Sequence, residues 1–352
     1  MTDALGSLYP RLAEQLPKSA IAELPTPLEQ HSVSANSPAA SLLVKRDDLT
    51  SKLYGGNKIR KLEYLLRRAQ DHDARRVATF GTVASNHALA TALFATAHKL
   101  ECTCLLSHQS KTPKAPIALN MHLRNHSEIV RYGGSRKSRI ETMRKYLQHR
   151  QTWVIPMGGS NWLGAIAFVN AALELCSQLD DAGLPIPDRV YVANGTMGTA
   201  AGLTLGFALA AMPTEVHAVR VTHDFVSNPP AMQRLIAKTA MMMRRLDGAI
   251  PADLEERARV IFRDEFFAGG YAHTNAATDA AIETAKSKFG LNLDTTYSGK
   301  AMAALLHDLT LPKLAGKNLL FWNTHNSRVL PVSAERPDDT SALPEEFLRY
   351  YV

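Results

Sequence analysis

The sequence predicts an α/β protein with two open, twisted, mostly parallel sheets that carry helices on both faces. Along most of the chain, short apolar segments alternate with longer amphipathic segments. This alternation is typical of parallel strands joined by helical crossovers. It starts again after a glycine-rich break at residues 158–161, and a chain of 352 residues is long enough for two domains.

We expect residues 1–40 to form an irregular arm, because prolines stand at positions 10, 17, 25 and 27. Apolar runs bounded by glycine, proline or polar residues predict strands at 42–45, 77–81, 103–106, 129–130, 153–156, 189–193, 216–221 and 319–322. Apolar residues at helical spacing predict helices from 58 onward, at 85–99, 115–124, within 131–150, and at 198–212, 230–242, 253–263, 274–288 and 299–309. From this order we predict a large domain over residues 1–56 and 162–352, and a smaller inserted domain over 57–161.

The chain carries a formal net charge of +7. This charge favours solubility or a small anionic ligand over nucleic acid, because no nucleic-acid-binding motif accompanies it. We interpret the densest basic stretch, residues 131–150, as a solvated helix face. The uncharged stretch 190–214 is interrupted by glycines and polar residues, so its apolar part is too short to cross a bilayer. We therefore expect neither a nucleic-acid partner nor a membrane partner.

Three cysteines, Cys102, Cys104 and Cys176, are too few for a disulfide framework. We interpret them as small buried hydrophobic residues in a reducing compartment. No cluster of histidine, cysteine and carboxylate has the spacing of a zinc site, so we expect no metal. The N-terminus lacks the basic start and apolar run of a signal peptide, and we expect a cytoplasmic protein.

Residues 55–63, Gly-Gly-Asn-Lys-Ile-Arg-Lys-Leu-Glu, place a lysine at the start of an amphipathic helix, whose buried face is marked by Ile59, Leu62 and Leu65. Lys58 therefore lies where the unpaired N–H groups of the helix gather partial positive charge, which should lower the pKa of its amine. A neutral amine can form a Schiff base. The alternative is an ordinary surface lysine, which is far more common at a helix start.

A second glycine-rich segment, residues 192–202, joins a predicted strand to a predicted helix. Gly195 and Gly198 allow tight turns, and Thr196 and Thr199 offer hydroxyls. Together with the N–H groups of the helix start, such a loop can hold one phosphate. The segment lacks the lysine of a Walker loop and the glycine spacing of a dinucleotide fingerprint. An ordinary strand-to-helix turn remains an equal alternative from this segment alone.

Residues 81–87, Gly-Thr-Val-Ala-Ser-Asn-His, have the same construction. Ser85 is a good helix N-cap, and Asn86 and His87 occupy the first helical turn. Such a turn can bind a carboxylate through backbone donors, a hydroxyl and an amide together. A routine serine cap and a structural histidine are the commoner alternatives.

Two tyrosines and the end of the last strand complete the candidate groups. Tyr271 and Tyr297 stand near predicted loops, where a phenol can transfer a proton or simply bury its ring. The segment 321–326, Phe-Trp-Asn-Thr-His-Asn, ends the last predicted strand with polar residues, which is where α/β proteins collect their ligands.

Together these segments resemble the pyridoxal 5'-phosphate (PLP) enzymes of the D-cysteine desulfhydrase and 1-aminocyclopropane-1-carboxylate (ACC) deaminase family, which have the tryptophan synthase β-like fold, fold type II. The similarity runs in order from about residue 42 to residue 326. Its motifs are Lys-Arg-Asp-Asp-Leu, Gly-Gly-Asn-Lys-x-Arg-Lys-Leu-Glu, Ser-Asn-His, Gly-Gly-Ser-Asn-x-x-Gly, the glycine- and threonine-rich loop, and Tyr-Ser-Gly-Lys-Ala-Met.

The resemblance implies that PLP is the cofactor and that Lys58 holds it as a Schiff base. Asn86 would hold the phenolic oxygen of PLP, and Thr324 would face its pyridine nitrogen. The residues implied to cradle its phosphate are Gly195, Thr196, Met197, Gly198 and Thr199. Met197 replaces a residue that is usually small in this family.

The resemblance also implies where a small amino-acid substrate binds. Ser85, Asn86 and His87 would receive the substrate carboxylate. Tyr297 would stack near the cofactor, and Tyr271 would lie on the substrate side. We count Lys58, both tyrosines and Ser85 as the expected catalytic residues.

The implied reaction is an α,β-elimination in which D-cysteine gives pyruvate, ammonia and sulfide. The freed amine of Lys58 would take the Cα proton, while PLP accepts the electrons. ACC deaminase is the alternative, although the resemblance implies a glutamate where this chain has Ser298. A protein of another class, which binds PLP or an amino acid without catalysis, is a further alternative, because His325 and Asn326 replace glycines of the family. Relatives of this kind are usually homodimers.

Overall fold

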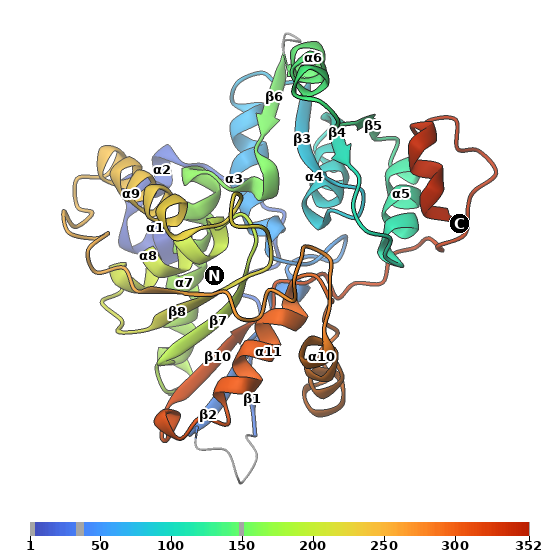
Figure 1. The fold of residues 1–352 in the computed structure, drawn as a ribbon. Coiled ribbons are helices and arrows are strands. Elements are labelled where there is room, and N and C mark those ends of the chain that lie inside the picture. The colour runs from blue at the N-terminus through green and yellow to red at the C-terminus, as the bar shows by residue number, and fades with distance from the viewer. Residues whose placement is uncertain (1–3, 33–38, 148–150, 352) are drawn as a thin grey trace. The chain divides into compact units, whose positions relative to one another are not determined.

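The computed structural model describes residues 4–32, 39–147 and 151–351, and the chain divides into two compact units (Figure 1). The large unit comprises Met1–Pro17, Ala22–Lys61 and Ser160–Ser327, and the second unit comprises Lys18–Ile21, Leu62–Gly159 and Arg328–Val352. The boundary falls inside helix α3 (Lys58–Gln70). Our division into a large domain over residues 1–56 and 162–352 and a smaller inserted domain over 57–161 stays a prediction.

A six-stranded sheet forms the centre of the large unit. Its order is β1 (Leu28–His31), β2 (Ser41–Lys45), β10 (Asn318–Trp322), β7 (Arg189–Asn194), β8 (Glu215–Arg220) and β9 (Val260–Arg263). The pair β1–β2 is antiparallel, and the other pairs are parallel. The carboxyl ends of the parallel strands therefore meet at one edge, where ligand sites of α/β sheets form.

Helices cover both faces of this sheet, as the sequence predicts. Helices α10 (Ala276–Phe289) and α11 (Ser298–Asp308) close a hydrophobic core over residues such as Tyr191 and Phe321. Helices α7 (Trp162–Asp181), α8 (Gly198–Leu209) and α9 (Pro229–Leu246) pack against one another. The prediction of an α/β fold with two mostly parallel sheets is confirmed.

Within the described residues, α7 is the one helix long and apolar enough to span a membrane, but 72% of its apolar window is buried inside the molecule. It contacts α8 closely, since a Cβ added at Gly202 would lie 2.1 Å from the carbonyl oxygen of Ala165. Such burial is typical of a core helix. The uncharged stretch 190–214 forms β7, a loop and the buried α8, as predicted.

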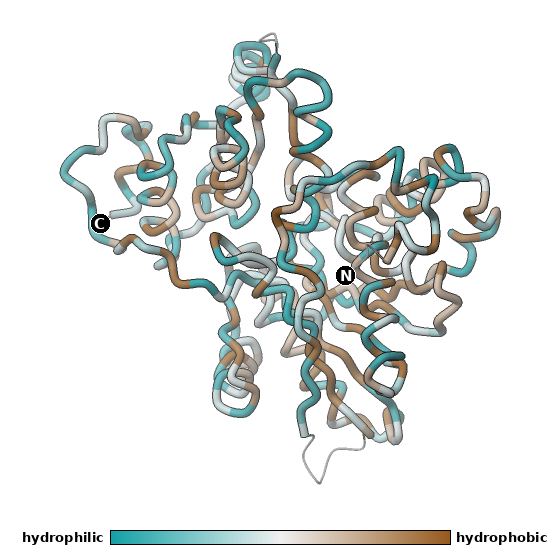
Figure 2. Tube along the Cα trace, turned by 180° about the vertical axis from the view of Figure 1, so that it is seen from behind, coloured by the Kyte–Doolittle hydropathy of each residue, from teal (hydrophilic) through white to brown (hydrophobic). Residues whose placement is uncertain are grey.

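The second unit holds a four-stranded parallel sheet. Its order is β5 (Glu128–Arg131), β4 (Glu101–Ser107), β3 (Arg76–Thr82) and β6 (Thr152–Ile155). Its helices are α4 (Asn86–Ala97), α5 (Lys114–Arg124) and α6 (Arg136–Leu147), and a 3-10 helix, η4 (Glu345–Tyr351), ends the described chain. Figure 2 shows α6 as mostly hydrophilic, which agrees with a solvated basic helix. Arg150, at the end of the basic stretch, lies outside the described residues.

Two predicted elements are wrong. The N-terminal arm is not irregular, because it forms α1 (Ala4–Leu8) and α2 (Pro10–Gln15), whose Leu5 and Leu12 are buried. Pro10 opens α2, where its missing N–H costs nothing. The helix predicted at 253–263 is replaced by strand β9, because pairing with β8 suits its Val-Ile-Phe run better than a helix does.

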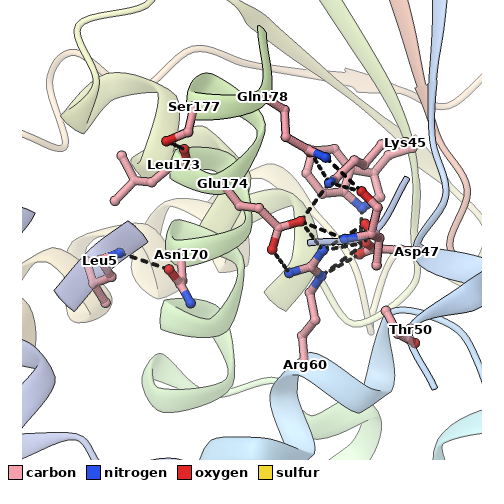
Figure 3. Close-up of polar contacts among 12 residues, drawn as sticks. Leu5, Lys45, Asp47, Thr50, Arg60, Asn170, Leu173, Glu174, Ser177 and Gln178 are labelled. Carbon is pink, nitrogen blue, oxygen red and sulfur yellow. Dashed lines mark hydrogen bonds and ion pairs between the residues drawn. The ribbon is translucent and has the colours of Figure 1, made fainter. Parts of the chain in front are cut away.

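A buried network of charges ties α3 to the large unit (Figure 3). Arg60 donates to Asp47 at 2.8 Å and to Glu174 of α7 at 2.9 Å. Lys45 of β2 donates to the other oxygen of Glu174 at 2.6 Å. The indole N–H of Trp322 donates to Asp47 at 2.8 Å. Two cations therefore face two carboxylates inside the protein.

The ionisation of this network follows from its pairing. Burial alone would raise the pKa of Glu174, but Arg60 and then Lys45 lower that pKa to about 2. Burial would likewise lower the pKa of Arg60, and the charges of Asp47 and Glu174 more than offset this and raise it. Glu174 and Arg60 are therefore charged at neutral pH, and the removal of either one leaves an uncompensated charge.

We predict that Arg60→Met lowers the free energy of unfolding by about 3–5 kcal/mol, because Asp47 and Glu174 lose a buried cation. Thermal unfolding followed by circular dichroism measures the effect. The matched control is Arg67→Met, which breaks an exposed pair with Asp71 on the same helix and should cost at most about 0.5 kcal/mol. Equal losses in the two variants would contradict the assigned importance of the network.

Candidate functional site

The turn before α3 brings Lys58 to the carboxyl end of the large sheet. A Cβ added at Gly55 would lie 1.9 Å from the carbonyl oxygen of Asp48, so this position needs glycine. Gly56 has a φ of +100°, and its Cβ would lie 2.9 Å from the carbonyl oxygen of Thr324. The two glycines therefore let the backbone pass close to the end of β10 just before Lys58.

The amine of Lys58 loses its proton more easily than that of an ordinary lysine. Its Nζ donates to Asn57 Oδ1 at 2.9 Å. Burial lowers the pKa of Lys58 to about 8, and the negative charge of Asp294 partly opposes this. The direction agrees with the sequence-based expectation, but burial is the first cause, whereas the sequence argument named the helix dipole.

The segment after β10 supports the same turn. Asn326 Oδ1 accepts the backbone N–H of Gly55 at 2.7 Å, and the N–H of Asn57 donates to the carbonyl oxygen of Thr324 at 3.3 Å. The backbone N–H of His325 donates to Asn323 Oδ1 at 3.3 Å. Where the family has glycine, Asn326 thus provides a side-chain acceptor that holds the turn of Lys58.

A polar cradle lies at the start of α8. Ser160 Oγ is 2.7 Å from Thr196 Oγ1, accepts the N–H of Gly198 at 3.3 Å, and accepts from Lys61 Nζ at 3.2 Å. A Cβ added at Gly198 would lie 2.7 Å from Ser160 Oγ and 2.9 Å from Lys61 Nζ. The absence of a side chain at Gly198 therefore lets a hydroxyl, an ammonium and a helix start converge.

The rest of the predicted phosphate loop is fixed by bonds to other parts of the large unit. Thr199 Oγ1 accepts from Asn57 Nδ2 at 2.9 Å, which joins the loop to the residue before Lys58. The carbonyl oxygen of Gly195 accepts from Thr222 Oγ1 at 2.9 Å. Met197 has a φ of +68°, a left-handed conformation that L-residues other than glycine, asparagine and aspartate rarely adopt.

The chemistry of the cradle suits an anion such as a phosphate. Burial, and then the positive charge of Lys58, lower the pKa of Lys61 well below its ordinary value. A bound dianion would counter both effects, because it replaces lost hydration and attracts the ammonium. The donors present are an ammonium, hydroxyls and a helix N-terminus, which is the chemistry of a phosphate site.

The two predicted tyrosines meet in the large unit. The hydroxyls of Tyr271 and Tyr297 are hydrogen-bonded to each other, and their rings lie edge to face at 5.8 Å. Burial, and then the neighbouring Tyr271, raise the pKa of Tyr297 well above its ordinary value. A Cβ added at Gly195 would lie 3.6 Å from the Tyr297 ring, so this tyrosine borders the phosphate loop.

Asp294 and Lys300 position the tyrosine pair. Asp294 caps α11 by accepting the N–H of Ser298 at 2.8 Å and its hydroxyl at 2.7 Å. Lys300 Nζ donates to the carbonyl oxygens of Phe267 and Gly270 at 2.7 Å and 2.9 Å, which holds the loop just before Tyr271.

The Ser-Asn-His turn lies in the second unit. Ser85 caps α4 by accepting the N–H of Ala88 at 3.2 Å, as predicted, and Asn86 is the first residue of the helix. His87 is buried, and its Nε2 lies 3.0 Å from Thr79 Oγ1. The ring of His87 thus packs into the second unit's own interior.

Sequence reasoning missed several residues of this site. Asn57, Ser160 and Asp294 bond to predicted site residues or shift their pKa values, and Lys61 reaches them through Ser160. A lysine one helical turn after Lys58 and a serine in the Gly-Gly-Ser-Asn motif were signals in the sequence. Neither of these signals indicated which loop its side chain would reach.

Comparison with known proteins agrees with the resemblance in the sequence. A family model for pyridoxal-phosphate dependent enzymes matches residues 20–324. The chain is 31% identical over 329 residues to D-cysteine desulfhydrase of Klebsiella pneumoniae subsp. pneumoniae, covering 90% of this chain and 96% of that protein. It is 31% identical over 308 residues to D-cysteine desulfhydrase of Serratia proteamaculans, covering 85% and 90%.

Solved structures carry the same fold. A crystal structure of an ACC deaminase homologue superimposes with a TM-score of 0.76 and 25% identity, covering 93% of this chain and 96% of that one. An L-serine ammonia-lyase from Rhizomucor miehei superimposes with a TM-score of 0.59 at 18% identity, covering 93% and 98%. The chain therefore belongs to the pyridoxal-phosphate dependent enzyme family, and PLP is its cofactor.

Proposed function

We propose that the protein is a lyase that eliminates sulfide from D-cysteine, giving pyruvate, ammonia and sulfide with the uptake of one water. The observation that carries the proposal is the partly buried amine of Lys58, with a pKa of about 8, beside the phosphate cradle of the same unit. The relatives named D-cysteine desulfhydrase, at 31% identity over most of the chain, support the choice of substrate.

Lys58 has two tasks in this proposal. Its amine would hold PLP covalently, and the same amine, when it is free, would take the proton from the substrate Cα. When bound, PLP supplies an electron sink for this step. A lysine with a pKa near 8 suits a general base, because its pKa lies close to neutral pH and its neutral form is far more populated there than that of an ordinary lysine.

Tyr271 and Tyr297 are proposed to supply the proton that leaves with the sulfide. The raised pKa of Tyr297 keeps its phenol protonated, so a proton is present at this position, held more tightly than in a free tyrosine. Their shared hydrogen bond lets a proton lost by one phenol be replaced by the other.

We propose that the turn at Ser85, Asn86 and His87 receives the substrate carboxylate, and that Asn86 also holds the phenolic oxygen of PLP. Ser85 has the hydroxyl and the cap position that such a role needs. Because the ring of His87 packs against Thr79, we assign the contact at this residue to its backbone.

ACC deamination is the second candidate, and the solved ACC deaminase homologue supports it. Against it stands Ser298, whose hydroxyl donates to Asp294 in the helix cap at 2.7 Å. The position where a deaminase would carry a glutamate is thus occupied by a short, buried side chain. A protein that binds PLP without turnover is the third candidate. We also propose a cytoplasmic location, with which three free cysteines are compatible, and a homodimer, as the resemblance implies.

The function is tested with PLP-loaded protein and a panel of D-cysteine, L-cysteine, D-serine and ACC, scored for keto acid and sulfide. We expect keto acid and sulfide in equal amounts from D-cysteine, and none from Lys58→Ala. Keto acid formed from ACC would support the deaminase function instead. A protein that shows the cofactor's colour but converts no amino acid would select the binding protein, and unchanged turnover in Lys58→Ala would refute the role of Lys58.

We predict that Lys61→Met weakens PLP binding about 10- to 100-fold, because a charge-assisted contact to the phosphate is lost. Equilibrium dialysis of the apoprotein with PLP measures the effect. Pyridoxal, which lacks the phosphate, should bind the variant and the unaltered protein equally. The control is Lys52→Met, whose side chain is 87% exposed in the same unit. An equal loss of pyridoxal binding would indicate general damage to the site.

We predict that the rate at which PLP attaches to Lys58 in the apoprotein rises about tenfold per pH unit and levels off above pH 8. The reason is that the neutral amine is the reactive form. For an ordinary lysine the plateau would lie near pH 10.5. Asp294→Asn removes a charge that favours the ammonium, so the midpoint should move to lower pH, whereas Asp279→Asn on exposed α10 should leave it in place. Stopped-flow absorbance measures the rate, and a midpoint near 10 would contradict the assigned environment.

A further inference from the structure

The segment after residue 327 folds onto the second unit, beyond the residues 20–324 that the family model matches. Within η4, Tyr350 is buried, and its hydroxyl makes two backbone contacts with one residue. It accepts the N–H of Gln109 at 3.0 Å and donates to the carbonyl oxygen of Gln109 at 3.1 Å. The backbone of Gln109 is thereby held by a residue that lies 241 positions away in the chain.

The side chain of Gln109 in turn contacts the Ser-Asn-His turn. Its Oε1 accepts the backbone N–H of Ala84, the residue before the cap Ser85, at 3.2 Å. The end of β4 supports the same turn, because the carbonyl oxygen of Ser107 accepts the N–H of Val83 at 3.0 Å. The other side of the turn is tightly packed, since a Cβ added at Gly81 would lie 2.5 Å from the Cβ of Ser85.

We propose that Gln109 and Tyr350 are positioning residues that set the 82–87 turn for the carboxylate of the amino-acid substrate. This inference rests on the proposed function, in which that turn receives the carboxylate. Gln109 acts through the N–H of Ala84, and Tyr350 acts through the backbone of Gln109. The C-terminal segment thus belongs to the substrate-binding apparatus although it contributes no group to the substrate.

The same segment is attached to the second unit at other points, and these attachments provide controls. Tyr351 donates to Asn120 Oδ1 at 2.6 Å, and Asn120 Nδ2 donates to the carbonyl oxygens of Ser333 and Glu335 at 2.9 Å and 2.7 Å. Tyr351→Phe removes one tyrosine hydroxyl from the same helix as Tyr350→Phe does. It leaves the contact to Gln109 intact.

Hydrogen exchange of the holoprotein, read by mass spectrometry, tests the link to the turn without any turnover. In Gln109→Met and Tyr350→Phe, peptides that span residues 82–90 should exchange about fivefold faster or more. Gln109→Met removes the hydrogen bond to the turn, and Tyr350→Phe removes the bonds that hold Gln109 in place for it. Tyr351→Phe should leave these peptides unchanged and affect only peptides near Asn120. Equal exchange at 82–90 in all three variants would overturn the positioning role.

Substrate kinetics test the consequence. We expect KM for D-cysteine to rise about fivefold in Gln109→Met and in Tyr350→Phe, with kcat changed less than about twofold. Because the two residues act in series, the double variant should match Gln109→Met alone, whereas independent structural damage would add up. Tyr351→Phe should keep the original KM.

Binding of D-alanine separates this proposal from the proposed function. D-alanine has the carboxylate but no leaving group, and its dissociation constant can be read from the absorbance of the bound cofactor. Weaker D-alanine binding in the two variants, even in a protein that releases no sulfide, would support the proposal. If the two variants bind D-alanine and D-cysteine as tightly as the unaltered protein does, Gln109 and Tyr350 do not position the substrate.

Discussion

The ion pairs of Arg60 with Asp47 and Glu174 are the constraint on which the rest of the large unit depends. Arg60 lies two residues after Lys58, so its bonds fix the rotation of the first turn of α3. Asp47 also accepts the N–H of Gly56 through its carbonyl oxygen at 2.9 Å. One buried carboxylate residue thereby holds both the turn that precedes Lys58 and the helix that follows it. A surface pair could not do this, because screening and side-chain entropy would leave the turn free to move.

The sequence predicted the architecture where each signal was local. Apolar strands bounded by glycine, the serine cap of α4 and the uncharged β7–α8 segment all depend on neighbouring residues. The sequence failed where tertiary contacts decide. Strand β9 exists because β8 offers an edge to pair with, and α1 exists because its Leu5 N–H reaches Asn170 of α7 at 3.0 Å. Neither partner can be read from the segment itself.

The same distinction between local signals and tertiary contacts applies to the candidate site. Lys58, the 195–199 loop and the tyrosines were found because motifs mark them. Lys61 and Asp294 were missed because their importance lies in the distances to groups far along the chain. The cause of the low Lys58 pKa was misjudged for a related reason: the helix dipole is visible in a sequence, whereas burial is a property of the folded chain.

The two lysines of the first turn of α3 explain why this site needs an anionic cofactor. Burial disfavours the charge on both Lys58 and Lys61, and Lys58 further lowers the pKa of Lys61. Asp294 supplies a compensating charge near Lys58. On our proposal the cofactor's phosphate supplies the corresponding charge at Lys61, through the cradle at Ser160 and Gly198. A dianion in this cradle would raise the pKa of Lys61, because it attracts the ammonium and replaces the hydration that burial removes. The phosphate would therefore supply at Lys61 the compensating negative charge that Asp294 supplies at Lys58.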